Sequence, residues 1–105
     1  MEKAGQKNAG TLRVTDVRIL RFKDGTDTGR VRAVAEVTLE GQLLLKGLRV
    51  TEGEGGLYVA YPHDPFYRGE DYRTLYAPVT RELRERIEDA VLGTYHEENA
   101  KGGKR

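Results

Sequence analysis

The chain has 105 residues, of which 37% are hydrophobic and 33% charged, and this length predicts a single domain with a modest core. The 18 Lys and Arg side chains nearly balance the 17 Asp and Glu side chains, so the overall charge favours neither a nucleic acid nor a membrane as partner. The absence of cysteine excludes disulfide frameworks, thiolate metal sites and cysteine nucleophiles, and it fits a reducing compartment.

The charge is unevenly spread along the chain. Residues 1–35 carry a net charge of +4, residues 36–79 carry −3, and residues 80–105 are neutral. The polar N-terminus does not resemble a signal peptide, and the longest uninterrupted run of Leu and Val is Leu43–Leu45. Since about 20 apolar residues are needed to span a bilayer, we expect a soluble, cytoplasmic protein with no membrane partner.

The first part of the chain predicts two strands joined by a turn. Residues 12–22 have a hydrophobic pattern whose parity switches, which predicts a strand with a β-bulge. Residues 24–29 contain Asp, Thr and two Gly and predict a turn. Residues 30–40 alternate most clearly and predict the second strand. Its apolar face carries Val31, Ala33, Ala35, Val37 and Leu39.

Two further strands follow a predicted turn at Glu40-Gly41. Residues 42–50 form the third strand, with Gly47 at a β-bulge because the apolar parity changes across it. A glycine-rich turn over residues 52–56 leads to a short fourth strand over residues 57–61. Consecutive strands joined by short turns favour an antiparallel meander.

The last part of the chain predicts an irregular stretch and a helix. Residues 62–71 are irregular, and residues 72–77 form a short edge strand that Pro78 ends. Thr80 is the predicted N-cap of a helix that frays near Glu97–Glu98, where acidic side chains oppose the helix dipole. Its apolar stripe consists of Leu83, Ile87, Ala90, Val91 and Tyr95.

These elements predict an α+β domain of two layers. A small antiparallel meander of four to five strands needs cover on one side, and the single C-terminal helix has one apolar face to provide it. We therefore expect the domain to occupy residues 12–97, between a flexible N-terminal extension over 1–11 and a flexible C-terminal tail over 98–105.

Several short motifs resemble the stage V sporulation protein G (SpoVG) family, the septation regulators of bacteria. They occur in order and at compatible spacing over roughly residues 13–97. The motifs are Val14-Thr15-Asp16-Val17-Arg18, Gly29-Arg30-Val31-Arg32-Ala33, Leu48-Arg49-Val50, Gly56-Leu57-Tyr58-Val59-Ala60 with Pro62, Pro78-Val79, and Ile87-Glu88-Asp89-Ala90-Val91-Leu92 with Tyr95-His96.

The resemblance implies a small antiparallel sheet with a C-terminal helix, usually in a homodimer built through the sheet, and a regulator rather than an enzyme. Members of the family are linked to sporulation, septation and gene control and are regarded as DNA- and RNA-binding proteins. This chain departs from them between Pro62 and Gly69. Typical members have Ser-Lys-Arg-Thr-Pro-Asp there, whereas this chain has His63–Arg68, with Asp64 and Pro65 where the dibasic pair would stand.

A first group of candidate nucleic-acid-binding residues consists of arginines on the early strands. If Phe22 pairs near Val31, then Arg21 and Arg32 lie together on one face, where a phosphate would relieve the repulsion between like charges. The alternative is a solvated face partly neutralised by nearby carboxylates. The arginines are Arg13, Arg18, Arg21, Arg30 and Arg32, and the carboxylates are Glu36 and Glu40.

A second group lies on the predicted helix. A helix N-terminus favours phosphate, and the resemblance to nucleic-acid-binding proteins supports this role for the arginines that follow it. The alternative is that these arginines pair with carboxylates of the same helix. The arginines are Arg81, Arg84 and Arg86, and the carboxylates are Glu82, Glu85 and Glu88.

A third group lies in the irregular stretch, where aromatic and arginine side chains alternate. Exposed rings there would stack on unpaired bases, at about 1–3 kcal/mol each. The alternative is that the rings cover a thin edge of the core or a dimer seam. The group consists of Phe66, Tyr67, Arg68, Tyr72 and Arg73.

No enzyme motif is recognisable in the sequence. His63-Asp64 and His96-Glu97 are adjacent pairs without metal-ligand spacing, and no nucleophile completes a catalytic triad. The segment 52–56 lacks the Lys and Ser or Thr of a phosphate-binding loop. We therefore predict no catalytic residue, no metal site, no cofactor and no enzymatic activity.

Two functions remain from the sequence. The first is a dimeric nucleic-acid-binding regulator, of DNA and RNA, linked to septation and sporulation-type control. The second is an adaptor that binds a cell-division protein without contacting nucleic acid, which the near-neutral charge and the missing dibasic pair favour. The first requires that folding gathers the arginines into one cationic strip. If each arginine is neutralised by its own carboxylate, that interpretation loses its support.

Overall fold

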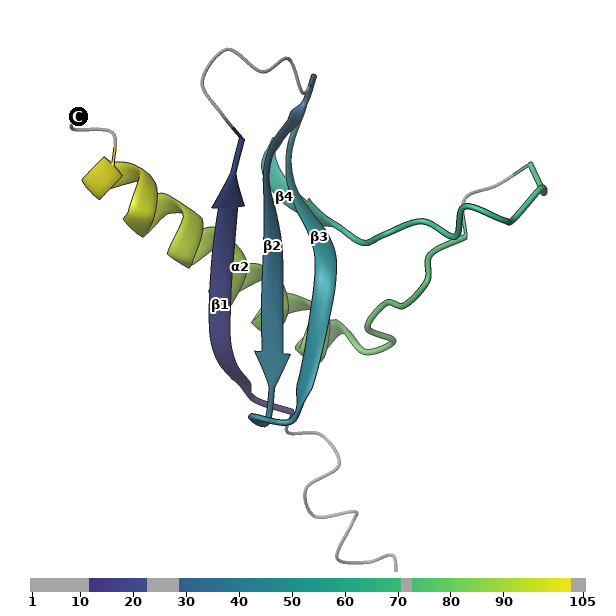
Figure 1. The fold of residues 1–105 in the computed structure, drawn as a ribbon, viewed down its shortest axis with the longest axis horizontal. Coiled ribbons are helices and arrows are strands. Elements are labelled where there is room, and N and C mark those ends of the chain that lie inside the picture. Colours follow the sequence, from purple (N-terminus) through teal and green to yellow (C-terminus); the bar gives the residue numbers. More distant parts are fainter. Residues whose placement is uncertain (1–11, 23–28, 71–72, 103–105) are drawn as a thin grey trace, which may run out of the picture.

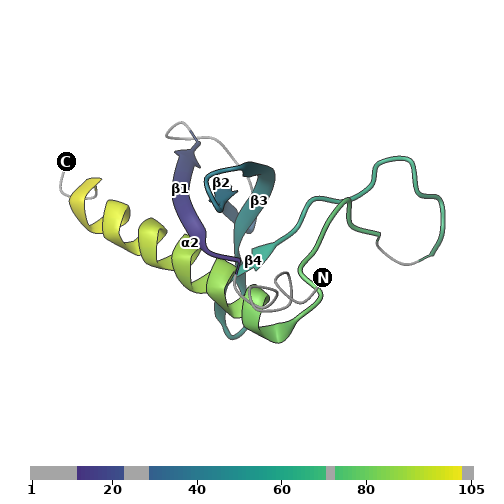
Figure 2. The same ribbon diagram turned by 90° about the horizontal axis from the view of Figure 1, so that it is seen from below.

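The computed structural model describes residues 12–22, 29–70 and 73–102 (Figure 1). These ranges hold four strands in one antiparallel sheet of order β1-β2-β3-β4, and a long helix that lies across one face of it (Figure 2). The predicted α+β architecture and meander are confirmed. The elements are β1 (Val14–Arg21), β2 (Val31–Leu39), β3 (Leu43–Gly53), β4 (Gly56–Ala60) and α2 (Arg81–Gly102).

The predicted bulge in the first strand is confirmed. Val14 pairs with Leu39 and Asp16 pairs with Thr38, so Thr15 is an extra residue in β1. The Thr15 hydroxyl donates to the backbone oxygen of Thr38 at 3.2 Å and accepts from the Gly41 amide at 2.9 Å. This side chain therefore ties the bulge to the turn between β2 and β3.

The bulge at Gly47 in β3 is confirmed as well. Leu45 pairs with Val37 and Leu48 pairs with Ala35, so two residues of β3 lie opposite the single residue Glu36. Gly47 has φ +87°, a backbone conformation that L side chains rarely adopt. The bulge lets Leu43 and Leu45 before it and Leu48 after it lie on the same, helix-facing side of the sheet.

The turns match the predictions with one difference. Glu40 and Gly41 have φ of +53° and +64°, as a type I′ hairpin turn requires. β3 runs to Gly53 rather than ending near Val50, because Gly53 and Gly56 still pair across the next turn. Residues 23–28, which include most of the first predicted turn, lie outside the described residues.

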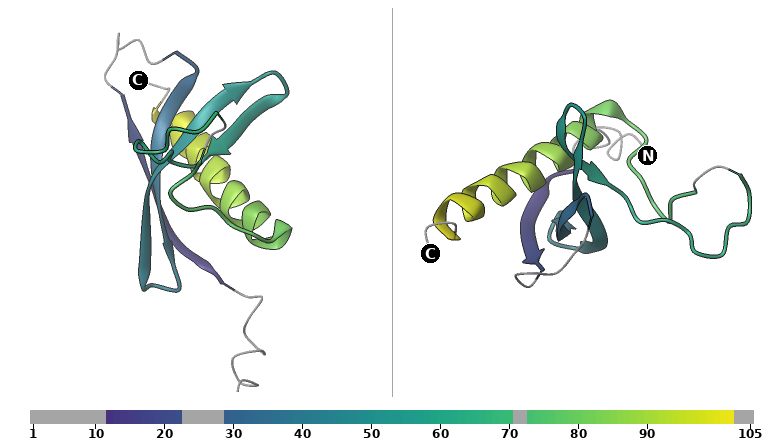
Figure 3. Two further views of the ribbon diagram at one scale, coloured as in Figure 1. Left: turned by 90° about the vertical axis from the view of Figure 1, so that its right-hand side faces the viewer. Right: turned by 90° about the horizontal axis from the view of Figure 1, so that it is seen from above.

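The predicted edge strand over 72–77 is wrong for the part that the structure describes. Instead of joining the sheet, this segment pairs with the chain that leaves β4, through the isolated bridge His63–Thr74. The Asp64 amide donates to the Arg73 oxygen at 2.7 Å and the Leu75 amide donates to the Pro62 oxygen at 2.8 Å. We call residues 62–70 and 73–75 the arm, which projects away from the sheet (Figures 1 and 3).

Thr80 caps α2 as predicted, because its hydroxyl accepts a hydrogen bond from the Leu83 amide at 3.1 Å. The helix continues to Gly102, so the predicted end near Glu97–Glu98 was too early. Acidic residues at a helix end cost only about 0.3–1 kcal/mol, and the Ala and Lys that follow favour helix. Residues 1–11 and 103–105, predicted to be flexible, lie outside the described residues.

The core lies between α2 and the helix-facing side of the sheet. The apolar face predicted for the second strand is buried from Ala33 to Leu39, and Ile87 and Val91 of the predicted helix stripe pack against it. Among the described residues, no helix is both long enough and apolar enough to cross a membrane. The buried apolar residues are Ala33, Ala35, Val37, Leu39, Leu48, Val50, Val59, Tyr61, Ile87 and Val91.

Candidate nucleic-acid interface

Three arginines on or beside the sheet, Arg13, Arg18 and Arg32, are paired with carboxylates. Arg13 lies 3.2 Å from Glu40, and this hydrogen bond lowers the pKa of the Glu40 carboxyl and raises the pKa of Arg13. Arg18 lies 3.8 Å from Glu36. For these strand arginines the structure therefore supports the alternative, in which local carboxylates neutralise the face.

Arg32 is paired with a carboxylate that the sequence did not indicate. Its guanidinium donates two hydrogen bonds to Glu52 of β3, which lower the pKa of the Glu52 carboxyl and raise the pKa of Arg32. These residues line a shallow hollow of about 290 Å³ with Arg30 and Glu54. Two carboxylates at the hollow make it a poor site for a phosphate.

The predicted meeting of Arg21 and Arg32 on one face is wrong. Arg21 pairs with Ala33, one residue away from the expected register, and a shift of one residue moves a side chain to the opposite face. Arg21 thus lies on the helix side, where its guanidinium is 4.8 Å from the centre of the Tyr95 ring. It also donates to the Tyr95 backbone oxygen at 3.3 Å, so Arg21 ties β1 to α2.

The arginines at the start of α2 are not paired with carboxylates. Arg84 donates to the Pro78 oxygen at 3.4 Å, and Arg86 donates to the Leu12 oxygen at 3.3 Å. Within the described ranges, none of the ion pairs involves Arg81, Arg84 or Arg86. Intrahelical pairing, the alternative interpretation of these residues, is therefore wrong. The three guanidiniums on the first two turns of α2 thus have no ion-pair partner among the described residues, although Glu82 and Glu85 lie on the same turns.

The arm carries the predicted aromatic and arginine side chains, apart from Tyr72, which lies outside the described residues. Arg73 lies 4.0 Å from Asp64, and its guanidinium is 5.3 Å from the centre of the Tyr67 ring. Arg68 is exposed and forms no ion pair among the described residues. Phe66 is 82% exposed, so it does not cover an edge of the core of its own chain.

The arginines thus do not form the single cationic strip that the nucleic-acid-binding interpretation required, and its support is reduced to the arginines without a carboxylate partner among the described residues. The structure places Arg81 and Arg84 on one side of α2 and Arg86, two residues further along, on the other side, where it bonds Leu12. Arg68 and Arg73 lie on the arm, and Arg21 and Arg32 lie on opposite faces of the sheet. In the described parts of the chain, no cluster of three or more His, Asp or Glu side chains could hold a metal ion.

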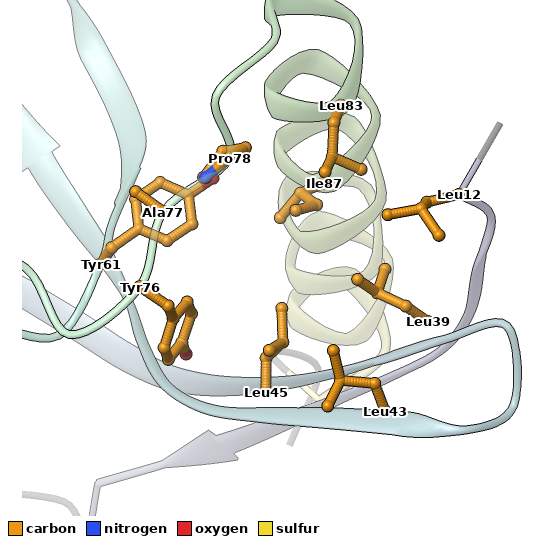
Figure 4. A pocket seen from close by; sticks show the side chains of 10 residues that line it. All are labelled: Leu12, Leu39, Leu43, Leu45, Tyr61, Tyr76, Ala77, Pro78, Leu83 and Ile87. Carbon is orange, nitrogen blue, oxygen red and sulfur yellow. The ribbon is translucent and has the colours of Figure 1, made fainter. Parts of the chain in front are cut away.

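An apolar pocket beside the start of α2 was not predicted from the sequence (Figure 4). It has a volume of about 220 Å³ and lies where the arm joins the body. The Tyr61 hydroxyl is buried without a hydrogen-bond partner among the described residues, whereas the Tyr76 hydroxyl donates to the Lys46 oxygen. The lining residues are Leu12, Leu39, Leu43, Leu45, Tyr61, Tyr76, Ala77, Pro78, Leu83 and Ile87.

The sequence contains two apolar segments that line this pocket, but it does not show that they lie next to each other in the fold. Leu43–Leu45 is an unusual apolar run in a strand, and Tyr76-Ala77-Pro78 is apolar just before the helix. Only the long-range pairing of the strands and the path of the arm show that these two segments meet beside α2, where they line one pocket (Figure 4).

Comparisons with known proteins agree with the resemblance seen in the sequence. A model of the SpoVG family matches residues 12–97. The protein named "Putative septation protein SpoVG" in Priestia megaterium is 40% identical over 85 residues, which cover 81% of this chain and 84% of the relative. Proteins of the same name are 40% identical in Archaeoglobus fulgidus, with 95% of that relative covered, and 41% identical in Bacillus subtilis, with 84% covered.

Proposed function

Because this chain belongs to the SpoVG family, whose members are named for septation, we propose that it is a dimeric nucleic-acid-binding regulator linked to septation and sporulation-type control. The observation that carries this proposal is the group of three arginines at the start of α2 that have no carboxylate partner among the described residues. We expect it to act in the cytoplasm, where DNA and RNA are accessible, and to use no catalytic chemistry.

The helix start is the part of the surface best suited to phosphate. Arg81 and Arg84 add two charges near the amides of the first helical turn, which favour anions, and Glu82 of the same turn offsets part of this charge. The hydrogen bonds of Arg84 and Arg86 to backbone oxygens orient their guanidiniums without neutralising them. A two-fold dimer presents this group twice and so doubles the number of phosphates that it contacts.

The arm extends the proposed surface. Arg68 has no ion-pair partner among the described residues, and Arg73 holds the Tyr67 ring, so this part of the arm offers a cation and a stacking platform for an unpaired base. Arg21 and Arg32 contribute little in this proposal, because Tyr95 and Glu52 already hold their guanidiniums.

The proposal is tested by the salt dependence of binding. Fluorescence anisotropy with short duplex DNA and single-stranded RNA should show affinity that falls steeply with salt. The slope should be about −0.9 per phosphate contact for the duplex. Failure to bind either probe even at low salt would overturn the proposal.

A second candidate function rests on the exposed apolar residues. Phe66 of the arm and Val79, which is 94% exposed, are large apolar side chains without cover in the chain itself. They favour the alternative of a cell-division adaptor. A pull-down that recovers one stoichiometric protein after nuclease treatment would support this alternative, whereas recovery that nuclease abolishes would support the nucleic-acid-binding regulator.

A further inference from the structure

We propose that, in the dimer, Phe66 on the arm of each copy inserts into the apolar pocket of the other copy. This inference rests on the existence of the dimer in the proposed function and not on nucleic-acid binding. It builds that dimer through the arms, whereas the family resemblance implies a dimer built through the sheet. It assigns an occupant to the pocket at the arm base and a role to the most exposed aromatic side chain in the described part of the chain.

The pocket suits a phenyl ring in size and chemistry. Its volume of about 220 Å³ exceeds the roughly 150 Å³ of an apolar protein cavity that is known to bind benzene. Leucine, isoleucine, proline and tyrosine side chains converge on it (Figure 4). At its rim Leu12 and Leu43 are 41% and 55% exposed, so apolar surface there stays in contact with water until a partner covers it.

Phe66 is held in an exposed position by the local backbone. Its amide donates to the Asp64 side-chain oxygen at 2.9 Å, and the Tyr67 amide donates to the Asp64 backbone oxygen at 3.3 Å. These two bonds form a turn that fixes the backbone at Phe66. The neighbouring Tyr67 ring stacks on Arg73, whereas the Phe66 ring has no such contact among the described residues.

The arm keeps Phe66 away from the pocket of its own chain. The bridge His63–Thr74 and the hydrogen bonds on both sides of it join the two halves of the arm. The arm leads away from both the sheet and α2 (Figures 1 and 2). The pocket lies at the base, beside Tyr76 and Pro78, and Phe66 lies beyond the bridge.

The separation of Phe66 from the pocket of its own chain allows two copies to place their Phe66 rings in each other's pockets. Because the ring and the pocket lie at opposite ends of one arm, a two-fold axis across the middle of two antiparallel arms brings both rings to both pockets at once. Such an interface is closed and does not continue into a filament. Leu75 on the arm and Val79 beside the pocket are exposed apolar residues that the facing arm would cover.

The test measures the dimer dissociation constant of the full chain, free of nucleic acid, by analytical ultracentrifugation. Phe66→Ser should raise this constant at least about 100-fold, because both copies lose an aromatic anchor. Phe66→Leu should restore much of the affinity. The matched control is Phe22→Ser, since Phe22 is the other Phe of the chain, is 38% exposed and lies outside the pocket and the core. The control should leave the constant unchanged.

A second variant probes the other end of the interaction. Leu43→Glu places a charge at the rim of the pocket and should weaken the dimer as strongly as Phe66→Ser. Combining the two should weaken it little further, because both changes disrupt the same interaction. Thermal unfolding of each variant under monomeric conditions should match the wild type, because neither residue is in the core.

The outcomes separate this inference from the proposed function. A wild-type chain that is monomeric, or a Phe66→Ser variant that dimerises as tightly as the wild type, would overturn the arm exchange, while nucleic-acid binding is scored in its own titration. A dimer that Phe66→Ser disrupts supports the exchange even if neither DNA nor RNA binds.

Discussion

At the scale of single residues, burial sets the ionisation of two tyrosines. It raises the pKa of Tyr61 to about 12, with the nearby Glu88 raising it further and Arg84 lowering it. Burial likewise raises the pKa of Tyr76 to about 12, with a smaller contribution from Tyr61. Because an exposed tyrosine ionises near pH 10, the folded state favours the neutral phenols.

This difference predicts how stability changes in alkali. A pKa that is higher in the folded state contributes stability that is complete below about pH 10 and is lost as the pH rises through about 12. Tyrosinate absorbance should therefore show Tyr61 and Tyr76 ionising together with unfolding. The variants Tyr61→Phe and Tyr76→Phe should each lack one of the ionisation steps that occur above pH 10, which assigns those steps to the two residues. Ionisation of all six tyrosines near pH 10 with native circular dichroism would contradict the account.

The ion-pair partners of single arginines could be predicted only where strand alternation decides them. The pairing of Arg13 and Arg18 with carboxylates of β2 and its turn follows from adjacent strands, and Glu40 and Glu36 were candidates from the sequence. Glu52 as the partner of Arg32 depends on how far β3 extends beyond Val50, which short-range patterns do not show.

At the scale of elements, the bulge in β3 has a specific backbone requirement. Gly47→Ala should lower the free energy of unfolding by about 1–2 kcal/mol, because an alanine at φ +87° is strained. Its Cβ would also lie 3.4 Å from the Cβ of Pro62. Gly55→Ala is the control, since its φ is not in the left-handed region and nothing lies within 4 Å of the added Cβ. Urea denaturation in which both variants lose the same stability would refute this role of Gly47.

Features that depend on neighbouring residues in the sequence could be predicted, whereas features that depend on pairing between distant segments could not. Parity changes located the bulges at Thr15 and Gly47 but not the register shift between Val31 and Ala33, and Thr80 marked the start of α2. The one-residue register that separates Arg21 from Arg32 is decided by the packing of β1 against α2, far along the chain. The prediction of an edge strand over residues 72–77 was wrong because the described part of this segment pairs with the first half of the arm, at His63–Thr74, and not with the sheet.

At the scale of the whole molecule, the balanced charge of the chain conceals an uneven distribution over its surface. The sheet arginines Arg13, Arg18 and Arg32 are matched by carboxylates, whereas those at the start of α2 bond backbone oxygens or have no partner among the described residues. The sequence could predict the arginine groups but not which of them would be neutralised. We assign the proposed phosphate contacts to the helix because its arginines have no carboxylate partner among the described residues, whereas Arg13, Arg18 and Arg32 do.

The most direct test compares two charge-matched double variants, Arg84→Gln with Arg86→Gln and Arg13→Gln with Arg18→Gln, in duplex-DNA affinity measured over a range of salt. Both pairs lower the net charge equally, and circular dichroism verifies that each variant keeps its helix. The helix pair should weaken binding at least roughly tenfold and reduce the salt slope by about 0.9 for each phosphate that the variant no longer binds. The strand pair should change both only slightly. Equal weakening in the two variants, or unchanged binding in the helix pair, would contradict the account.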